Sequence, residues 1–345
     1  MKQKSIGIVI ALLCLLLCLS VTACSSDPVK IKVLILPKFE VDEMAGDFPG
    51  EAQHYYEAYC QGGSEYDIRG SQEGNQLYVK DGVALYVTGM GKANAAASLT
   101  ALLADSRFDF SDAYILSTGC AGSSSEGTVM GDVFLITAAV DYDLGHHADP
   151  RDMTVSNDTT WFHDPSYDSS ACKLLDAALT EKAYALVKDI PLETTEKTRA
   201  YMTAALPDAD WACRDPQVLR GTTVTGDNYW KGAYDHANAV KQVQTYGCPD
   251  PYGTTEMEDV ALAVVADRMG ILDRLLILRV SVDLDTYMNG ATPEALWGEG
   301  ESMDLASEES VESADIFETA MENVFRVGSV LVDAICAGTL SGSTP

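Results

Sequence analysis

The sequence has 345 residues, of which 52 are Asp or Glu and 23 are Lys or Arg, so its formal net charge is −29. Phosphate-rich surfaces repel such a chain, which argues against a nucleic-acid-binding protein and against membrane binding through a polybasic surface. Because 47% of the residues are hydrophobic and only 22% are charged, the chain can bury a full core. At this length about 75% of the unfolded surface leaves water on folding, so we expect a folded protein over most of the sequence.

The N-terminus carries the one long apolar run of the sequence, residues 6–21, which is preceded by two lysines and closes on Val21-Thr22-Ala23-Cys24. This pattern predicts a cleaved signal peptide at 1–23. The cleavage motif resembles a bacterial lipobox, which implies lipidation of Cys24, a short tether at 24–30, and an extracytoplasmic protein that is lipid-anchored to the bacterial cell membrane. A retained membrane anchor is the alternative, although ~16 apolar residues are short for a bilayer span.

Six cysteines follow Cys24, far apart in the sequence and without Cys-x-x-Cys spacing. An even number of cysteines in an exported chain permits disulfides, and Cys213 with Cys248 is the pair we expect first, while free buried thiols remain equally open. The adjacent His146 and His147 cannot easily face one ion. We therefore expect neither a metal site nor another cofactor.

Short apolar runs alternate with helical patterns along the rest of the chain. The runs predict strands at 31–36, 83–87, 114–116, 133–136, 222–224 and 275–280. The helical patterns lie at 93–103, 171–186, 256–269 and 314–335. This alternation predicts an α/β fold, a three-layer sandwich with a mixed, largely parallel central sheet. We expect one domain at 31–345, with an insertion at about 141–220.

Candidate site residues follow these strands, at the edge where ligands gather in open α/β sheets. Each segment alone is a weak signal, since a Gly-x-Gly before a helix is more often a tight turn than a binding site. Five segments in a fixed order are more specific. They are Gly89-Met90-Gly91-Lys92-Ala93-Asn94, Thr118-Gly119-Cys120-Ala121-Gly122, Gly226-Asp227-Asn228-Tyr229-Trp230, Glu256-Met257-Glu258, and Arg279 with Asp283 four residues later.

The order of these segments resembles that of the nucleoside phosphorylase and nucleosidase superfamily, in particular the nucleosidases that cleave methylthioadenosine and adenosylhomocysteine. Within that superfamily the chain is most similar to the purine nucleoside permease family, through Phe39, Pro49-Gly50-Glu51, the segment 226–232 and the stretch 258–283. The resemblance implies a nucleoside phosphorylase-like fold and a purine nucleoside as ligand. Because we find no further apolar run, we do not expect the chain to form a permeation path alone.

The resemblance also implies roles for individual residues. Glu258 would accept hydrogen bonds from the ribose hydroxyls, with Met257 packed on the sugar and the ring of Tyr229 stacked on the purine. Asp283 would protonate or hydrogen-bond N7 of the leaving base, a role that needs a carboxyl pKa raised by burial. Asp42, after the first strand and close to Glu40 and Glu43, would activate water, while ordinary surface acids are the alternative for all three. The remaining members of the expected site are Gly89, Gly119, Cys120, Asp227 and Arg279.

The choice between water and phosphate as the nucleophile depends on fixed positive charge. Phosphorylases of this superfamily hold phosphate with arginines, whereas the matching positions here carry Lys38 and Ser117. We therefore prefer water, with phosphate still possible.

Two readings other than an enzyme stay open. One is a lipid-anchored protein that captures purine nucleosides without cleaving them and delivers them to a membrane transporter. The other is a structural or interaction lipoprotein on the same fold. The preferred base, the 5′ substituent and the oligomeric state, including a possible homo-oligomer, are not fixed by the sequence.

Overall fold

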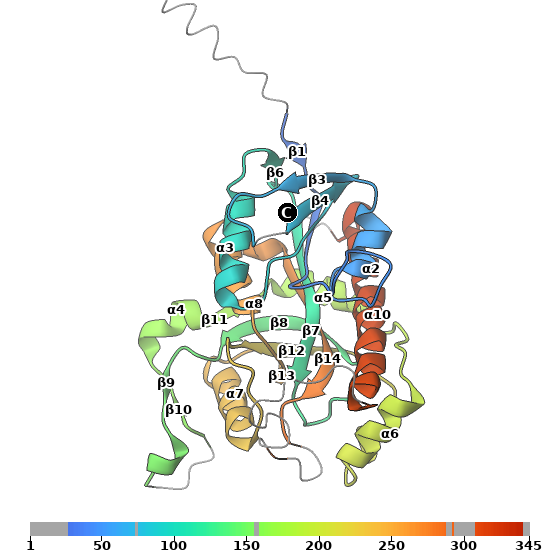
Figure 1. Ribbon diagram of the computed structural model, residues 1–345. Helices are drawn as coiled ribbons and strands as arrows, with labels where there is room; N and C mark the ends of the chain where they lie inside the picture. The colour runs from blue at the N-terminus through green and yellow to red at the C-terminus, as the bar shows by residue number, and fades with distance from the viewer. Residues whose placement is uncertain (1–26, 73–74, 155–158, 288–291, 293–307, 341–345) are drawn as a thin grey trace, which may run out of the picture.

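The computed structural model describes residues 27–72, 75–154, 159–287, 292 and 308–340. A central sheet runs through the molecule and is covered by helices on both faces (Figure 1). The predicted signal peptide and Cys24 lie outside the described residues, as do residues 293–307. The three-layer α/β architecture with a mixed sheet is confirmed.

Ten strands of the described chain form the central sheet, nine of them in one continuous path. In spatial order these nine are β11 (Cys172–Leu174), β8 (Val133–Asp141), β12 (Val218–Thr225), β13 (Tyr252–Glu256), β7 (Tyr114–Ser123), β2 (Val33–Leu36), β5 (Val83–Tyr86), β4 (Gln76–Lys80) and β3 (Ser64–Asp67). The tenth, β14 (Leu275–Leu284), pairs with both β7 and β8. Parallel pairs join β2 to β5 and β7, β14 to β7, and β12 to β8 and β13.

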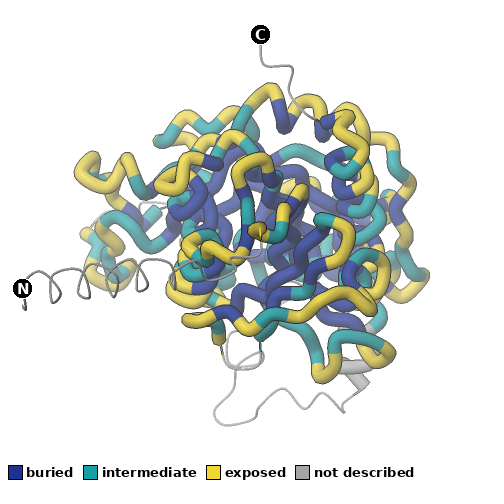
Figure 2. Tube along the Cα trace, turned by 90° about the horizontal axis from the view of Figure 1, so that it is seen from above, coloured by how far each residue is buried: buried dark blue, intermediate teal, exposed yellow. Residues whose placement is uncertain are grey.

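Strand β2 shows how the sheet divides two cores. Successive side chains of a strand point to opposite faces, and all four residues of β2 are buried. Val33 and Ile35 belong to one hydrophobic cluster, whereas Leu34 and Leu36 belong to the other. The continuous apolar run at 31–36 therefore reflects burial on both faces of the sheet. Seen from above, the buried backbone at the centre of the molecule is surrounded by exposed segments (Figure 2).

Different helices cover the two faces. One face packs against α3 (Lys92–Leu103) and α8 (Asp259–Arg268). The other face packs against α2 (Gln53–Tyr55), α5 (Ala177–Val187) and α10 (Glu308–Cys336). Helix α7 (Ala233–Thr245) lies beside β12 and β13. Two small strand pairs complete the fold: β1 (Val29–Lys30) with β6 (Phe108–Asp109), and β9 (His146–His147) with β10 (Trp161–Phe162).

The predicted helices agree with the structure at 93–103 and differ elsewhere. The pattern at 171–186 is interrupted, because α4 (Asp168–Ala171) is followed by the short strand β11 before α5 begins. The helix expected from residue 256 begins at Asp259, since Glu256 still belongs to β13. At the other end of the chain, α10 begins before the predicted residue 314.

The segment between β8 and β12, where we expected an insertion, contributes β11 to the main sheet and adds α6 (Glu196–Ala205). Val29 and Lys30, the last residues of the expected tether, form β1 and pair with β6. Among the described residues, we find no helix with the length and apolar character that a membrane crossing requires.

Candidate functional site

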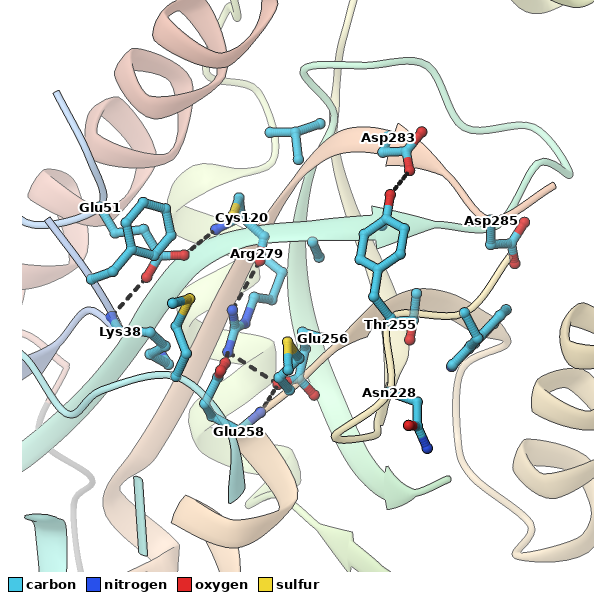
Figure 3. Close-up of a pocket in the computed structure, with 18 residues that line it drawn as sticks. Lys38, Glu51, Cys120, Asn228, Thr255, Glu256, Glu258, Arg279, Asp283 and Asp285 are labelled. Atoms are coloured by element: carbon cyan, nitrogen blue, oxygen red, sulfur yellow. Dashed lines mark hydrogen bonds and ion pairs between the residues drawn. The ribbon is translucent and has the colours of Figure 1, made fainter. Parts of the chain in front are cut away.

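A cleft of about 770 Å³, measured with its open mouth, lies where the parallel strands end. A concave site at this edge of an α/β sheet is where small ligands bind. Segments far apart in the sequence supply its walls, as Figure 3 shows. The lining residues are Lys38, Phe39, Glu51, Met90, Cys120, Ala121, Gly122, Asn228, Tyr229, Trp230, Thr255, Glu256, Met257, Glu258, Arg279, Val282, Asp283 and Asp285.

Glu258 is held at one end of the cleft by two donors. Its Oε1 accepts a hydrogen bond from the backbone N–H of Gly91 at 2.9 Å, and its Oε2 lies 3.2 Å from Nη2 of Arg279. The positive φ of Gly91, 86°, suits glycine and turns this N–H toward the carboxylate. Burial raises the pKa of Glu258, while the Arg279 guanidinium opposes the shift. The side chain therefore presents a fixed, nearly buried carboxyl group to the cleft.

Arg279 is fully engaged by the protein itself. Its Nε donates to Asp259 at 2.7 Å, its Nη1 donates to the carbonyl of Cys120 at 2.9 Å, and its Nη2 also contacts Glu256 at 3.1 Å. Glu256 in turn accepts hydrogen bonds from the backbone N–H groups of Glu258 and Asp259, both at 2.7 Å, and so caps the start of α8. Arg279 thus orients carboxylates and has little capacity left for an anionic ligand.

Glu51 supplies a second carboxylate to the same end of the cleft. Its Oε2 accepts from the N–H of Lys38 at 2.7 Å and its Oε1 from the N–H of Cys120 at 2.8 Å. A Cβ atom at position 119 would lie 2.2 Å from Glu51 Oε1, so only glycine at this position leaves room for the carboxylate. Gly119 therefore belongs to the site through this close approach.

Asp42, the expected water-activating residue, does not line the cleft. It is exposed, on a loop, with a φ of 50°. The neighbouring Glu40 folds that loop, since its Oε2 accepts from the N–H groups of Ala52 and Gln53 at 2.8 and 2.6 Å. This fold brings Glu51 into the cleft and leaves Asp42 outside. The Pro49-Gly50-Glu51 segment contributes to the family resemblance, but nothing in the sequence assigns Glu51 to the cleft.

Asp283 lies at the other end of the cleft, with three donors around it. Lys231 Nζ is 2.7 Å from Oδ1 and 2.9 Å from Oδ2, and the hydroxyl of Tyr229 donates to Oδ2. The N–H of Leu284 also donates to Oδ1 at 2.8 Å. Tyr229 is 62% exposed as a whole residue, and its hydroxyl contact places it beside Asp283. The aromatic ring and the acid predicted for the base are therefore brought together, but the acid is paired with an ammonium group.

A second aspartate, Asp285, lies nearby and was not predicted. Its side chain is fully buried and accepts from Nδ1 of His236 at 2.7 Å and from the hydroxyl of Tyr252 at 2.8 Å. The Asp285 carboxylate raises the pKa of His236, and Glu126, 3.5 Å from Nε2, adds to the shift. These contacts fix the end of β14 behind the Asp283 carboxylate.

Two other predicted site residues, Asp227 and Gly89, shape the start of α3 beside the cleft. Asp227 accepts from the N–H of Lys92 at 2.8 Å and so caps α3, next to Gly91. Gly89, with a φ of 84°, makes the turn before α3, where a Cβ atom would lie 2.4 Å from Gln72 Oε1. Both shape the loop that binds Glu258, and neither lines the cleft.

Cys120 contributes its thiol group to the lining of the cleft. Burial raises the pKa of Cys120 well above the usual range of a thiol, so the group stays neutral.

The expected pair of Cys213 with Cys248 is wrong, because Cys248 Sγ lies 3.9 Å from Cys172 Sγ and Cys213 is exposed beside the carbonyl of Asp210.

Comparison with known proteins identifies the family. The sequence profile of the purine nucleoside permease (NUP) family matches residues 30–339. The chain belongs to the purine nucleoside permease family. One relative, described as a probable purine nucleoside permease, comes from Schizosaccharomyces pombe; it is 28% identical over 273 residues, which cover 72% of this chain and 74% of the relative.

Solved structures similar to this permease family member are nucleosidases and a related hydrolase. The 5′-methylthioadenosine/S-adenosylhomocysteine nucleosidase of Neisseria meningitidis, in complex with methylthio-immucillin-A, has a TM-score of 0.53 at 17% identity, covering 88% of this chain and 98% of its own. A futalosine hydrolase mutant of Helicobacter pylori has a TM-score of 0.51 at 14% identity, covering 88% and 99%. At these identities the similarity establishes a nucleoside phosphorylase-like fold.

Proposed function

We propose that this protein binds a purine nucleoside in the cleft and hydrolyses its N-glycosidic bond to give the free base and ribose. The observation that carries the proposal is the pair of carboxylates at one end of the cleft, Glu258 and Glu51, opposite an aromatic and acidic end at Tyr229 and Asp283. The family and the fold of its nucleosidase neighbours support the same ligand class.

Glu258 suits the ribose end. A carboxylate can accept hydrogen bonds from two adjacent hydroxyls at once. These hydrogen bonds are well aligned when the carboxylate is already held in place. The Gly91 N–H and the Arg279 guanidinium fix it before ligand binds. Met257 lines the same part of the cleft and offers an apolar surface to the sugar ring.

Glu51 is our candidate for the group that activates water, in place of Asp42. Two of its lone pairs are used by backbone N–H groups, which leaves acceptor capacity on both oxygens for a water molecule. In the reaction, the bond between C1′ and N9 breaks with its electron pair on the purine, water oxygen bonds to C1′, and Glu51 takes a proton from that water. The departing purine anion takes up a proton from solvent and becomes the free base. An oxocarbenium-like sugar forms between two carboxylates, which stabilise its positive charge.

The charges of the cleft favour water over phosphate. Among the described residues that line it, five carboxyl groups face two cations, Lys38 and Arg279. The ammonium of Lys38 already donates to the carbonyls of Leu36 and Thr118 and to the hydroxyl of Ser117, at 2.7, 3.1 and 2.7 Å. A phosphate dianion would enter an acidic cleft whose cations are already neutralised.

Capture of the nucleoside without cleavage is the second candidate. The surroundings of Asp283 favour it, because both carboxylate oxygens already accept hydrogen bonds from the protein's own Lys231 and Tyr229. Such a protein would deliver its ligand to a membrane transporter.

The location of the protein is part of the proposal. We infer lipidation at Cys24 and anchoring outside the cytoplasm from the N-terminal sequence alone. Expression with a radiolabelled fatty acid tests this, since the wild type should be labelled and Cys24→Ala should not. Equal labelling of both proteins would reject lipidation at this residue.

The activity is tested by incubating purified protein with inosine, adenosine and guanosine and measuring free base by chromatography. We expect base release that Glu51→Gln abolishes and that Asp42→Asn, the exposed control, leaves unchanged. Calorimetric binding without base release would favour capture. Failure to bind any of the three nucleosides would reject both functions.

A further inference from the structure

The acidic side chains at the base end of the cleft are already paired. Lys231 Nζ lies 2.7 and 2.9 Å from the two carboxylate oxygens of Asp283, and the hydroxyl of Tyr229 donates to one of them. Nearby, Asp285 accepts from Nδ1 of His236 at 2.7 Å. These carboxylates hold the protein's own side chains, so a base finds its polar partners among other groups.

Two neutral side chains at this end are not engaged in this way. Asn228 and Thr255 line the cleft, and Figure 3 shows both on the side of Asp283, away from Glu51 and Lys38. Within the described part of the chain, neither side chain hydrogen-bonds to another residue. The amide of Asn228 and the hydroxyl of Thr255 are therefore available to a ligand.

The backbone of Asn228 is held through its two neighbours. Asp227 accepts a hydrogen bond from the N–H of Lys92 at 2.8 Å, and Tyr229 is anchored through its hydroxyl to Asp283. The amide group itself stays able to rotate. A polar group whose place is set in advance loses little freedom on binding, which favours affinity.

The arrangement of the cleft determines which edge of the base reaches Asn228. N9 carries the ribose and lies at the opposite end of the purine from N1 and C6. With the ribose hydroxyls at Glu258, the N1–C6 edge extends toward the end that Tyr229 and Asn228 line. This edge presents a donor beside an acceptor: adenosine has an amino group at C6 and an acceptor at N1, whereas inosine has a carbonyl at C6 and a donor at N1.

One amide can match both orders. Its carbonyl oxygen accepts, its NH₂ group donates, and a half-turn about the terminal torsion of the asparagine exchanges the two. We propose that Asn228 recognises the N1–C6 edge of the purine through this amide, so that the site binds 6-amino and 6-oxo purine nucleosides alike. The inference rests on the proposed function, because it places the base at the Tyr229 end of the cleft. Asn228 is then a residue that determines specificity.

Four nucleosides test this role. Adenosine and inosine present the complete edge, 1-deazaadenosine keeps the amino donor but lacks N1, and purine riboside keeps N1 but has no donor. We expect adenosine and inosine to bind within about threefold of each other and the two incomplete ligands about tenfold more weakly, since each loses one hydrogen bond of the amide. Dissociation constants can be obtained from tryptophan fluorescence in the first seconds after mixing, before turnover, because Trp230 lines the cleft.

Substitutions separate recognition from a structural role. Asn228→Leu keeps the approximate size of the side chain and removes both hydrogen bonds, so we expect all four ligands to bind with similar affinity. A merely structural role would weaken all four by the same factor and leave the preference intact. Thr255→Val removes only a hydroxyl and should preserve the preference. Gln244→Leu removes an exposed amide on α7, outside the cleft, and as the matched control should change nothing.

The outcomes are distinct. An unchanged preference for adenosine and inosine in Asn228→Leu would overturn the inference while leaving the proposed function intact. Loss of the preference in Thr255→Val but not in Asn228→Leu would also overturn it and assign the edge to the hydroxyl. Wild-type protein that binds only one of adenosine and inosine would contradict a reversible amide. If none of the four nucleosides binds, the proposed function fails and the inference fails with it.

Discussion

Nη2 of Arg279 lies 3.2 Å from Oε2 of Glu258, inside the cleft and almost out of contact with solvent. The arginine comes from β14 and the glutamate from the turn between β13 and α8, so the pair joins two strands that α8 separates in the sequence. The same guanidinium also contacts Asp259 and Glu256. The orientation of Glu258 is thus set by a buried network that exists before any ligand binds.

Removing the charge of Glu258 should reduce ligand binding far more than stability. We expect Glu258→Gln to lower the affinity for a purine nucleoside by roughly 100-fold, because charge-assisted hydrogen bonds to the ribose hydroxyls are lost. Calorimetric titration measures the effect, with the exposed Glu181→Gln as control. Unchanged affinity in Glu258→Gln would contradict the assignment of the ribose end.

Glu51 and Asp42, the two candidates for the general base after β2, should respond differently to substitution. We expect Glu51→Gln to lower kcat by about 100-fold or more, as loss of a general base does, with a small change in KM. Asp42→Asn should retain the wild-type rate, because Asp42 is exposed outside the cleft. Rates of base release measured at saturating nucleoside compare the two variants. A large loss in Asp42→Asn with full activity in Glu51→Gln would reverse the assignment.

Arg279 should be required for stability as well as for the site. Arg279→Met leaves Glu256, Glu258 and Asp259 without their shared cation, and breaking a buried pair in this way costs about 3–5 kcal/mol. Urea unfolding followed by circular dichroism gives the change in free energy of unfolding. As a control, Arg151→Met removes a cation whose side chain is 86% exposed and should leave the free energy of unfolding nearly unchanged. Equal losses in the two variants would show that the network contributes no special stability.

Stability should depend on pH through His236. The carboxylate of Asp285 raises the pKa of His236 above its ordinary value of 6.5, so the folded protein holds this proton more tightly than the unfolded chain does. The stabilisation is complete below about pH 6.5 and disappears as the pH rises through the folded pKa. We expect His236→Gln to lack this loss of free energy of unfolding. Parallel curves for the wild type and His236→Gln between pH 6 and 9 would refute the linkage.

Cys172 and Cys248 should form a disulfide in an oxidising compartment. Their sulfur atoms are 3.9 Å apart, and the bond would join β11 to the end of α7. Closing a loop of this length stabilises a protein by about 2–4 kcal/mol. Peptide mapping without reductant, after treatment with oxidised glutathione, should find these two cysteines joined. A bond from Cys248 to Cys213, or none, would contradict the arrangement; Cys213→Ser should leave the bond intact.

The sequence predicted the sheet and the ends of the cleft better than it predicted the residues that connect them. Apolar runs such as Val33–Leu36 identify strands buried on both faces, and glycines before α3 and after the first half of β7 mark where backbone approaches the site. Tyr229, Glu258 and Asp283 were expected in one cleft, and all three line it. Their convergence was predictable because each residue lies within four positions of the C-terminal end of a strand with a recognisable pattern.

Predictions failed where long-range contacts decide the structure. Glu51 enters the cleft because Glu40 folds the intervening loop through hydrogen bonds to its backbone, and no periodic pattern reports such a fold. Lys231 reaches Asp283 across 52 residues. The strand β11 interrupts an otherwise helical pattern because Cys172–Leu174 pairs with the edge of β8, which is a tertiary effect that overrides local propensity.

The most direct test of the account is the identity of the sugar product when a purine nucleoside is cleaved in phosphate buffer. Phosphorus NMR of such a reaction, run until chromatography shows substantial free base, distinguishes the two nucleophiles. We predict free base and ribose with no resonance of ribose 1-phosphate, because the cations of the cleft are already neutralised by its carboxylates. Ribose 1-phosphate accumulating in step with the base would contradict the hydrolytic mechanism.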